Sequence, residues 1–337
     1  MKILFCSHLF PPSVGGLETV SRILAEQFSG MGLNVTVVTT TPGTDVPVGS
    51  YRVVRGPSIR TLRQLGKESD IIFQNNISLQ TLIPLLSLRK PVVIAHQTWI
   101  RRTDGGMGWQ DYLKRALIKQ YRNIAISRAI AESLPVPSVV VGNLFEPAEF
   151  SIHQDAERTR DIVFMGRLVS DKGCDLLLRA LGLLRRQGLT PSLTVIGSGP
   201  EMEALKTLAA EMSIEDQVVF TGNLQEGRGR VVAQHRIMAI PSRWAEPFGI
   251  VALEGIAAGC AVVASSAGGL PEAVGPCGLL FPNGDAHALA ALLQDLLTSP
   301  RIAETSRLER MAHLERSDPA VVARKYIAVF EQALRRR

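Results

Sequence analysis

Residues 236–259 have the sequence RIMAIPSRWAEPFGIVALEGIAAG. The apolar run Arg236–Ala239 predicts a strand, and the small and apolar residues that follow Gly249 predict a helix. Glu246 then lies in the loop ahead of the helix, and Glu254 lies inside it, about one and a half turns on. The first backbone N–H groups of a helix have no partner within it, so they can hold an anion or a hydroxyl group. This strand, loop and helix predict a ligand site at the edge of a parallel sheet.

Glu254 has two interpretations. Its helix otherwise holds small and apolar residues, and a carboxylate buried there is costly unless something hydrogen-bonds to it. A ribose diol can supply those hydrogen bonds, which favours a nucleotide as the ligand. The alternative is a structural carboxylate that accepts hydrogen bonds from the backbone.

The same alternation of short apolar runs with helical segments extends over the whole chain, which predicts parallel sheets covered by helices. A chain of 337 residues is long enough for two cores, and the alternation restarts after a linker near residues 142–155. We expect an α/β fold of two Rossmann-like, doubly wound domains, 1–148 and 149–318, whose sheets face each other across a cleft. A helix at about 319–337 can pack back onto the first domain. The expected strands are 2–6, 35–39, 51–54, 70–73, 91–95, 123–126 and 138–141, then 161–165, 193–196, 217–220, 236–239 and 261–264.

Composition narrows the class of protein. Hydrophobic residues make up 46% of the chain and charged residues 20%, which is typical of a folded protein and not of a disordered one. The apolar stretch Ile250–Ala264 is interrupted by Glu254, so no transmembrane helix is expected, and the short apolar amino terminus favours a cytoplasmic location. Four scattered cysteines indicate neither a zinc site nor a disulfide framework.

The positive charge is concentrated in the first half. Residues 1–148 hold 16 Lys and Arg against 9 Asp and Glu, a net charge of +7, and the remainder hold 21 against 22, a net charge of −1. The excess is typical of a protein with an anionic partner, such as a membrane surface, a phosphorylated acceptor or nucleic acid, or of a surface with a surplus of solvated arginines. Arg101 and Arg102, in a loop expected near the cleft mouth, are candidate contacts to an acceptor. The helical segment 109–122 could lie on an anionic membrane, but its pattern favours a helix that buries its apolar face on the sheet.

Three further loops follow predicted strands. Gly15 and Gly16 stand between the first strand and a helix, where they allow a phosphate or sugar to approach the backbone or simply serve a tight turn. Arg167 and Lys172 share one strand-to-helix loop and suit a diphosphate, although two solvated cations are an equal alternative. The Gly197–Gly199 turn is a poor dinucleotide fingerprint but is compatible with a nearby nucleotide.

Taken in order, these motifs resemble family 4 of the retaining glycosyltransferases, which have the GT-B fold and an E-x7-E motif. The resemblance covers nearly the whole chain and is strongest over residues 160–285. It is carried by Gly15-Gly16, Gly166-Arg167-Leu168 with Lys172-Gly173, Gly197-Ser198-Gly199, Glu246-Pro247-Phe248-Gly249 with Glu254, Gly268-Gly269-Leu270-Pro271-Glu272, and Gly278-Leu279-Leu280-Phe281.

The resemblance implies a role for each candidate residue. Arg167 and Lys172 neutralise the donor diphosphate, Glu254 binds the ribose, and Glu246 binds hydroxyl groups of the transferred sugar. His96, at the end of a predicted strand, contacts the donor sugar in similar enzymes; capping of the strand end is its alternative. His96, Arg167, Lys172 and Glu246 form the implied catalytic set. The rest of the implied donor site consists of Gly15, Gly16, Gly166, Gly197, Gly199, Leu224, Phe248, Gly249 and Ile250.

The implied reaction is metal-independent front-face transfer of a hexose-type sugar from a UDP- or GDP-sugar to a glycan, a lipid-linked or a small-molecule acceptor. Neither a cofactor nor a divalent metal is expected, since the sequence contains no Asp-x-Asp motif. Nucleic acid is not among the implied partners, and peripheral contact with an anionic membrane stays open. The alternatives are a sugar-nucleotide epimerase of the same fold and a catalytically silent sugar-nucleotide-binding protein. An NAD-dependent oxidoreductase is disfavoured by the weak fingerprint.

Overall fold

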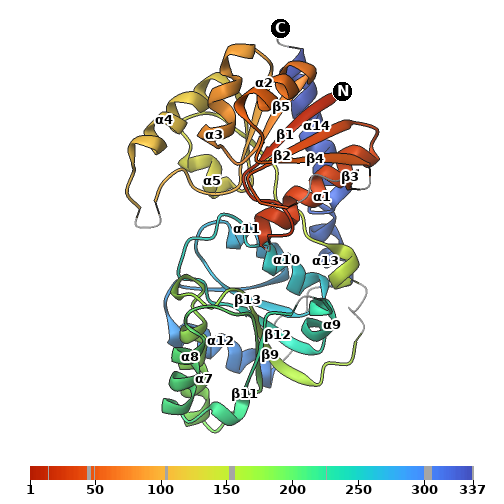
Figure 1. Cartoon of the computed structure of the whole chain (residues 1–337). Coiled ribbons are helices and arrows are strands. Elements are labelled where there is room, and N and C mark those ends of the chain that lie inside the picture. The colour runs from red at the N-terminus through yellow and green to blue at the C-terminus, as the bar shows by residue number, and fades with distance from the viewer. Residues whose placement is uncertain are drawn as a thin grey trace. The chain divides into compact units, whose positions relative to one another are not determined.

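A computed structural model describes residues 1–13, 15–43, 47–48, 50–102, 105–151, 156–224, 226–299 and 306–335. The chain forms two compact units, one of Met1–Leu144 with Asp318–Arg337 and one of Phe145–Ser317. The division at Leu144 lies four residues before the boundary expected at residue 148. Each unit contains one sheet with helices on its faces (Figure 1).

The first unit has a sheet in the order β3-β4-β2-β1-β5-β6-β7-β8. All of its described pairings are parallel except that of β3, a short edge strand antiparallel to β4. The chain winds one way from β1 and the other way from β5, so the order reverses between these two strands. Its strands are β1 (Lys2–Ser7), β2 (Asn34–Thr39), β3 (Pro47–Val48), β4 (Tyr51–Arg55), β5 (Ile71–Asn75), β6 (Val92–His96), β7 (Arg122–Ala125) and β8 (Val139–Val140).

The carboxyl-terminal helix α14 (Pro319–Leu334) belongs to the first unit and runs beside α1 (Gly16–Gly30) (Figure 1). Phe330 of α14 lies 5.1 Å from Phe73 of β5 and 5.4 Å from Phe28 of α1, measured between ring centroids. These rings are fully buried, so the end of the chain completes the core on one face of the first sheet. The other helices are α2 (Ile59–Glu68), α3 (Leu79–Leu82), α4 (Trp109–Leu117) and α5 (Arg128–Ser133), with 3-10 turns η1 (Ile83–Leu88) and η2 (Ile118–Gln120).

The second unit has a parallel sheet in the order β11-β10-β9-β12-β13-β14. Its strands are β9 (Arg160–Met165), β10 (Leu193–Ile196), β11 (Val218–Gly222), β12 (His235–Ile240), β13 (Ala261–Ser265) and β14 (Gly278–Phe281). Its helices are α6 (Pro147–Phe150), α7 (Cys174–Arg186), α8 (Met202–Glu211), α9 (Arg228–Ala233), α10 (Ile250–Ala257), α11 (Leu270–Val274), α12 (Ala286–Thr298) and α13 (Arg307–Glu315), with 3-10 turns η4 (Ser170–Lys172), η5 (Glu215–Gln217) and η6 (Gly275–Cys277).

The order of the second sheet reverses between β9 and β12. In an open parallel sheet, ligands bind beyond the carboxyl ends of the strands at such a reversal. The loops after β9 and β12 are therefore the positions at which this topology predicts a site. Every strand expected from the sequence is present, while β3 and β14 were not expected.

Candidate functional site

The loops after β9 and β12 meet at the point where the second sheet reverses. A Cβ atom on Gly173, which has a φ of +67°, would lie 2.0 Å from the carbonyl oxygen of Pro241, so the two loops touch through their backbones. Lys172 and Glu246, one from each loop, form an ion pair with 2.5 Å between Nζ and Oε1. Their side chains are 24% and 10% exposed, so solvent screens the pair only in part. The structure thus brings together a cation and a carboxylate 74 residues apart in the sequence.

Glu246 is held through one of its two carboxylate oxygens. Ser242 donates its hydroxyl hydrogen to the same Oε1 that binds Lys172, at 2.8 Å, and the Ser265 hydroxyl donates to the Ser242 carbonyl at 2.7 Å. No group in the described part of the chain donates to Glu246 Oε2. One oxygen is therefore fixed while the other is open to a hydroxyl group. Sequence reasoning missed Ser242, whose only signal was its position four residues before Glu246.

The amino terminus of α10 adjoins Glu246. Gly249 adopts a φ of +101°, which a residue with a side chain rarely adopts, and a Cβ atom there would lie 2.5 Å from a methyl group of Leu270. Within the described ranges, the backbone N–H groups of Phe248, Gly249 and Ile250 donate to no other protein group. The loop is braced by a 2.7 Å hydrogen bond from the Gly269 N–H to the Glu246 carbonyl. These three donors suit an anion or an electron-rich hydroxyl oxygen.

Glu254 lies on the second turn of α10 with a partly buried side chain. Burial raises the pKa of its carboxyl to about 7; the positive charge of Arg228 lowers it, and the negative charges of Glu146 and Glu149 raise it further. No backbone N–H of the described residues donates to the carboxylate, so the hydrogen bonds of the structural alternative are not found there. The carboxylate is left with capacity for an external donor such as a ribose hydroxyl.

Arg228 is a second residue that sequence reasoning missed. Its guanidinium carbon lies 5.7 Å from the centroid of the Phe150 ring, a cation–π contact. Glu149 lies beside it and accepts a 3.1 Å hydrogen bond from the Gly229 N–H at the start of α9. Arg228 was not predicted as a site residue because it lies in the segment 225–235, whose spacing departs from the family pattern.

The loops after β9 and β10 approach each other without side chains between them. A Cβ atom on Gly197 would lie 1.9 Å from the Gly166 carbonyl oxygen, and one on Gly199 would lie 2.2 Å from the Leu168 carbonyl oxygen. Arg167 is exposed, and no hydrogen bond or ion pair ties its guanidinium to the rest of the described chain. Leu224, after β11, is partly buried. Arg167 and Leu224 thus remain candidate donor contacts.

The loop after β1 carries a carboxylate. A Cβ atom on Gly15 would lie 2.5 Å from Oε2 of Glu18, and Glu18 Oε1 accepts a 3.1 Å hydrogen bond from the Ser13 hydroxyl. The exposed Gly16 begins α1. Because Glu18 would repel an anion, this loop suits a sugar hydroxyl better than the phosphate that the sequence left open.

His96 ends β6, and its side chain is fully buried. Its Nε2 lies 2.8 Å from Asn123 Oδ1, and the Asn123 amide donates to two backbone carbonyls, which leaves Oδ1 as the acceptor and His96 Nε2 as the donor. Nδ1 is buried without a partner, and burial lowers the pKa of the imidazole to about 4, opposed by the bond to Asn123. The ring is therefore neutral, and its contact with a donor sugar stays a prediction.

The predicted acceptor contacts, Arg101 and Arg102, are exposed in the loop before α4. The Arg101 guanidinium stacks 4.7 Å from the centroid of the Trp99 ring. Among the described residues, no group of three or more His, Cys, Asp or Glu side chains is arranged to hold a metal ion.

Two Rossmann-like units with mainly parallel sheets are the architecture of the GT-B fold. The chain belongs to the group 1 glycosyl transferases, whose family model matches residues 145–313, the second unit with its ion pair and α10.

Several relatives are named mannosyltransferases. A GDP-mannose-dependent alpha-(1-6)-phosphatidylinositol monomannoside mannosyltransferase from Mycolicibacterium smegmatis is 37% identical over 42% of this chain and 39% of that protein. One of the same name from Mycobacterium tuberculosis H37Rv is 27% identical over 88% of this chain and 89% of its own length. Among solved structures, Anabaena HepE in complex with UDP and glucose superposes with a TM-score of 0.78 at 21% identity, covering 98% of this chain and all of HepE.

These findings establish a glycosyltransferase. They give the epimerase alternative no support.

Proposed function

We propose that this chain is a retaining, family 4-like glycosyltransferase that transfers a hexose from a nucleoside diphosphate sugar. The observation that carries the proposal is the Lys172–Glu246 pair next to the free N–H groups of α10 and the open carboxylate of Glu254. It combines cationic, amide and carboxylate groups in one unit, which together match a diphosphate, sugar hydroxyls and a ribose diol. A silent sugar-nucleotide-binding protein has no need for a partly buried ion pair at this position.

GDP-mannose is the donor that we propose to test first. The named GDP-mannose-dependent relative from Mycobacterium tuberculosis aligns with 88% of this chain, whereas HepE, whose complex contains UDP, is 21% identical and supports the fold alone. A lipid-linked or glycan acceptor is proposed on the same grounds. We further propose that the basic first unit contacts the cytoplasmic face of an anionic membrane.

The proposed chemistry is front-face transfer, in which the departing diphosphate helps to deprotonate the acceptor hydroxyl. Arg167 and Lys172 stabilise the negative charge that develops on the diphosphate, and the N–H groups at the start of α10 hold the sugar with Glu246. A divalent metal is not expected to take part, because two cations already serve the diphosphate. His96 is fully buried, and a pKa lowered to about 4 makes its neutral ring only a weak base, so we do not assign it the role of general base.

The test is a thermal-shift panel of GDP, UDP, ADP and NAD, each with and without EDTA. Wild type should be stabilised by GDP with or without EDTA, since a ligand that binds only the folded state raises the melting temperature. Glu254→Ala should lose that shift, and the matched variant Glu211→Ala, at an exposed carboxylate on α8, should keep it.

Each other outcome contradicts a stated part of the proposal. Stabilisation by UDP alone refutes the proposal of a GDP-sugar donor but is consistent with the proposed nucleotide site. Stabilisation only by NAD, or an equal shift in both variants, refutes the site. With GDP-mannose and an acceptor, the anomeric configuration of the product, read by NMR, tests retention.

A further inference from the structure

Helix α4 (Trp109–Leu117) has an unusual exposure for a helix of an α/β unit. None of its nine residues is buried. Trp109 is 72% exposed and Tyr112 is 64% exposed. The sequence favoured a helix that buries its apolar face on the sheet. Leu113 and Leu117 of that face are partly buried, whereas Tyr112 of the same face is exposed.

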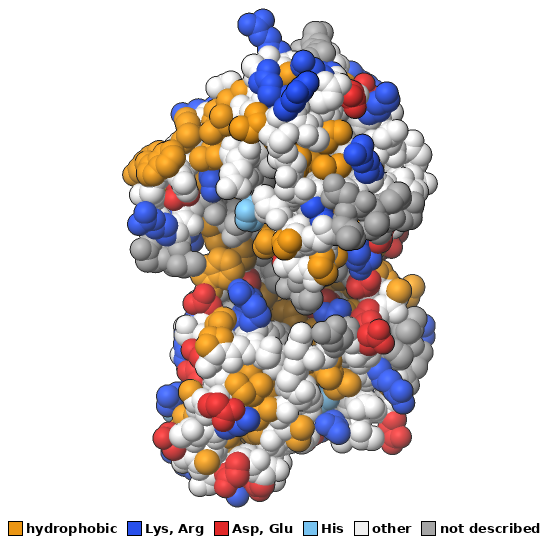
Figure 2. Space-filling view, in the orientation of Figure 1, with side chains coloured by type: hydrophobic (Ala, Val, Ile, Leu, Met, Phe, Trp, Pro, Cys, Tyr) orange, Lys and Arg blue, Asp and Glu red, His pale blue; other side chains and the backbone are white. Residues whose placement is uncertain are grey.

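The exposed residues form one continuous stripe. Trp109, Tyr112 and Ala116 are spaced at i, i+3 and i+7, which puts them on one face of α4, and all three are exposed. Lys119, in the 3-10 turn η2 that follows α4 directly, is exposed as well. Figure 2 shows hydrophobic side chains gathered at the upper left, over α4.

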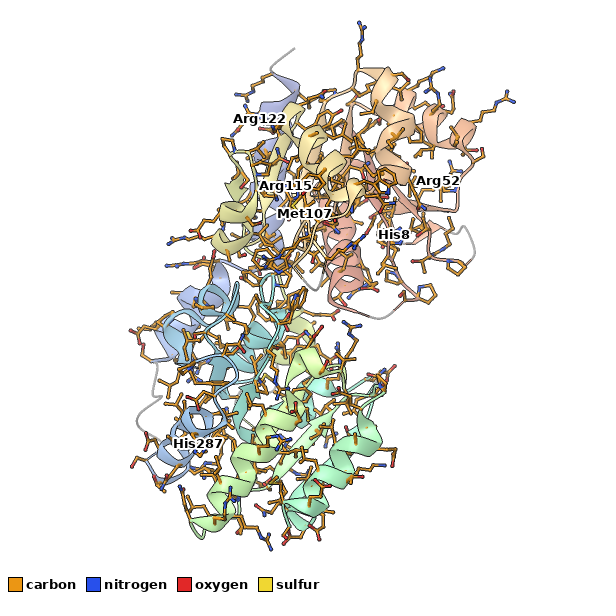
Figure 3. The ribbon with its side chains drawn as sticks, turned by 90° about the vertical axis from the view of Figure 1, so that its left-hand side faces the viewer. His8, Arg52, Met107, Arg115, Arg122 and His287 are labelled. Atoms are coloured by element: carbon orange, nitrogen blue, oxygen red, sulfur yellow. The ribbon has the colours of Figure 1, made fainter. Side chains whose placement is uncertain are left out.

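The helix is held from a different side. Arg115 donates a 3.0 Å hydrogen bond to the carbonyl of Ser133 at the end of α5. Within α4 itself, the Asp111 carboxylate caps the first turn by accepting a 2.9 Å hydrogen bond from the Gly108 N–H. Figure 3 shows α4 on the face turned to the viewer, with Met107 and Arg115 labelled beside it. The bond from Arg115 ties α4 to α5 and leaves the aromatic stripe uncovered.

The charge around the stripe is strongly positive. Residues 99–122 contain six Lys and Arg against two Asp, a net charge of +4. Arg101 and Arg102 are exposed in the loop before α4. Exposed Trp and Tyr beside basic residues are the combination that lies at the headgroup level of an anionic bilayer.

We propose that α4 is the surface with which the first unit docks on an anionic lipid bilayer. Trp109 and Tyr112 enter the headgroup region, and Arg101, Arg102 and Lys119 face the lipid phosphates. A second copy of the chain is a worse occupant, because a two-fold interface on this stripe would bring the same positive charges together. The inference rests on the proposed membrane contact and is independent of the donor nucleotide. No helix of the described residues is long and apolar enough to cross a bilayer.

The experiment uses the full chain and sedimentation with vesicles. Vesicles of phosphatidylcholine mixed with phosphatidylglycerol should bind wild type at least about tenfold better than phosphatidylcholine alone, and added salt should weaken that binding. Trp109→Ser combined with Tyr112→Ser should lower binding to the anionic vesicles by about tenfold or more, since two aromatic anchors are removed.

The second unit offers a matched control. Leu308 and Met311 of α13 are 79% and 56% exposed at the same i, i+3 spacing. Leu308→Ser combined with Met311→Ser should leave vesicle binding unchanged. In the absence of vesicles, the GDP-induced thermal shift of the Trp109/Tyr112 variant should equal that of wild type, which separates failure of this inference from failure of the donor site.

Three results would overturn the inference. The inference is refuted if wild type does not bind anionic vesicles. It is also refuted if the Trp109/Tyr112 variant binds anionic vesicles as well as wild type does. If the substitutions instead convert a dimer to a monomer in light scattering, the stripe is an interface between copies and not a membrane surface.

Discussion

Replacing Glu254 by Gln should stabilise the protein at alkaline pH and leave its stability nearly unchanged at acid pH. Glutamine has almost the shape of the protonated carboxyl group but carries no charge. The folded state raises the pKa of Glu254 from its ordinary value of 4.5 to about 7, so it disfavours the ionised form. Between these two pKa values the folded state binds more protons than the unfolded state, and wild type therefore loses stability as the pH rises through this window.

The size of the effect follows from the pKa. Each tenfold change in the protonation equilibrium corresponds to about 1.4 kcal/mol, so the change from 4.5 to about 7 corresponds to about 3 kcal/mol of lost unfolding free energy at pH 8. Because the side chain retains some contact with solvent, this is an upper value. For a domain of this size it corresponds to a rise in melting temperature of up to roughly 10 °C in the variant.

The assay is scanning calorimetry of wild type and Glu254→Gln at about pH 4.5 and pH 8, without nucleotide. The variant should melt higher at pH 8 and within about 1 °C of wild type at pH 4.5. Glu211→Gln, at an exposed carboxylate, is the control and should change neither value. An equal gain at both pH values, or a loss at pH 8, would contradict this expectation, since either would mean that the charge of Glu254 is not penalised in the folded protein.

Three further substitutions test the site and its surroundings. Lys172→Ala should weaken GDP binding by about tenfold or more in calorimetric titration, because it removes a cation from the diphosphate site. The control Lys206→Ala, at an exposed ion pair on α8, should leave GDP binding unchanged. Equal effects of the two substitutions would contradict the assignment of Lys172. Gly197→Ala should lower the melting temperature and abolish GDP binding, because its Cβ would meet backbone at 1.9 Å, while Gly284→Ala, with open space around it, should cost only about 1 kcal/mol. His96→Gln should remove a pH dependence of stability. As the pH falls from 6.5 to about 4, wild type should lose stability relative to the variant, because in this range the unfolded chain binds a proton that the folded chain does not. Parallel acid unfolding curves of the two proteins would count against this.

Local patterns were enough to predict the strands and the order of the motifs. A parallel strand buried on both faces appears in the sequence as a short apolar run, so twelve of the strands were expected within about two residues of their bounds. The strands that escaped are β3, which has two residues, and β14, whose half-exposed residues dilute the apolar signal. The Glu246–Glu254 spacing also follows from local structure, since a helix fixes how far along its axis each residue lies.

Contacts between segments far apart in the sequence could not be predicted from local patterns. No local pattern indicates that Lys172 meets Glu246, that Ser242 holds one of its oxygens, or that Arg228 lies near Glu254, because these contacts depend on which strands are neighbours in the sheet. The burial of His96 could not be predicted from local patterns either. The residue ends a strand as expected, but the packing around that strand end encloses its ring.

Patterns along the chain were enough to predict the alternation of strands and helices, the two-domain class and the residue types available for binding a nucleotide sugar. Which of those residues share a site, which are enclosed, and that the aromatic stripe of α4 is uncovered became known only from the folded chain. Periodicity shows which face of an element is apolar, but what that face contacts depends on the neighbouring elements in the assembled fold.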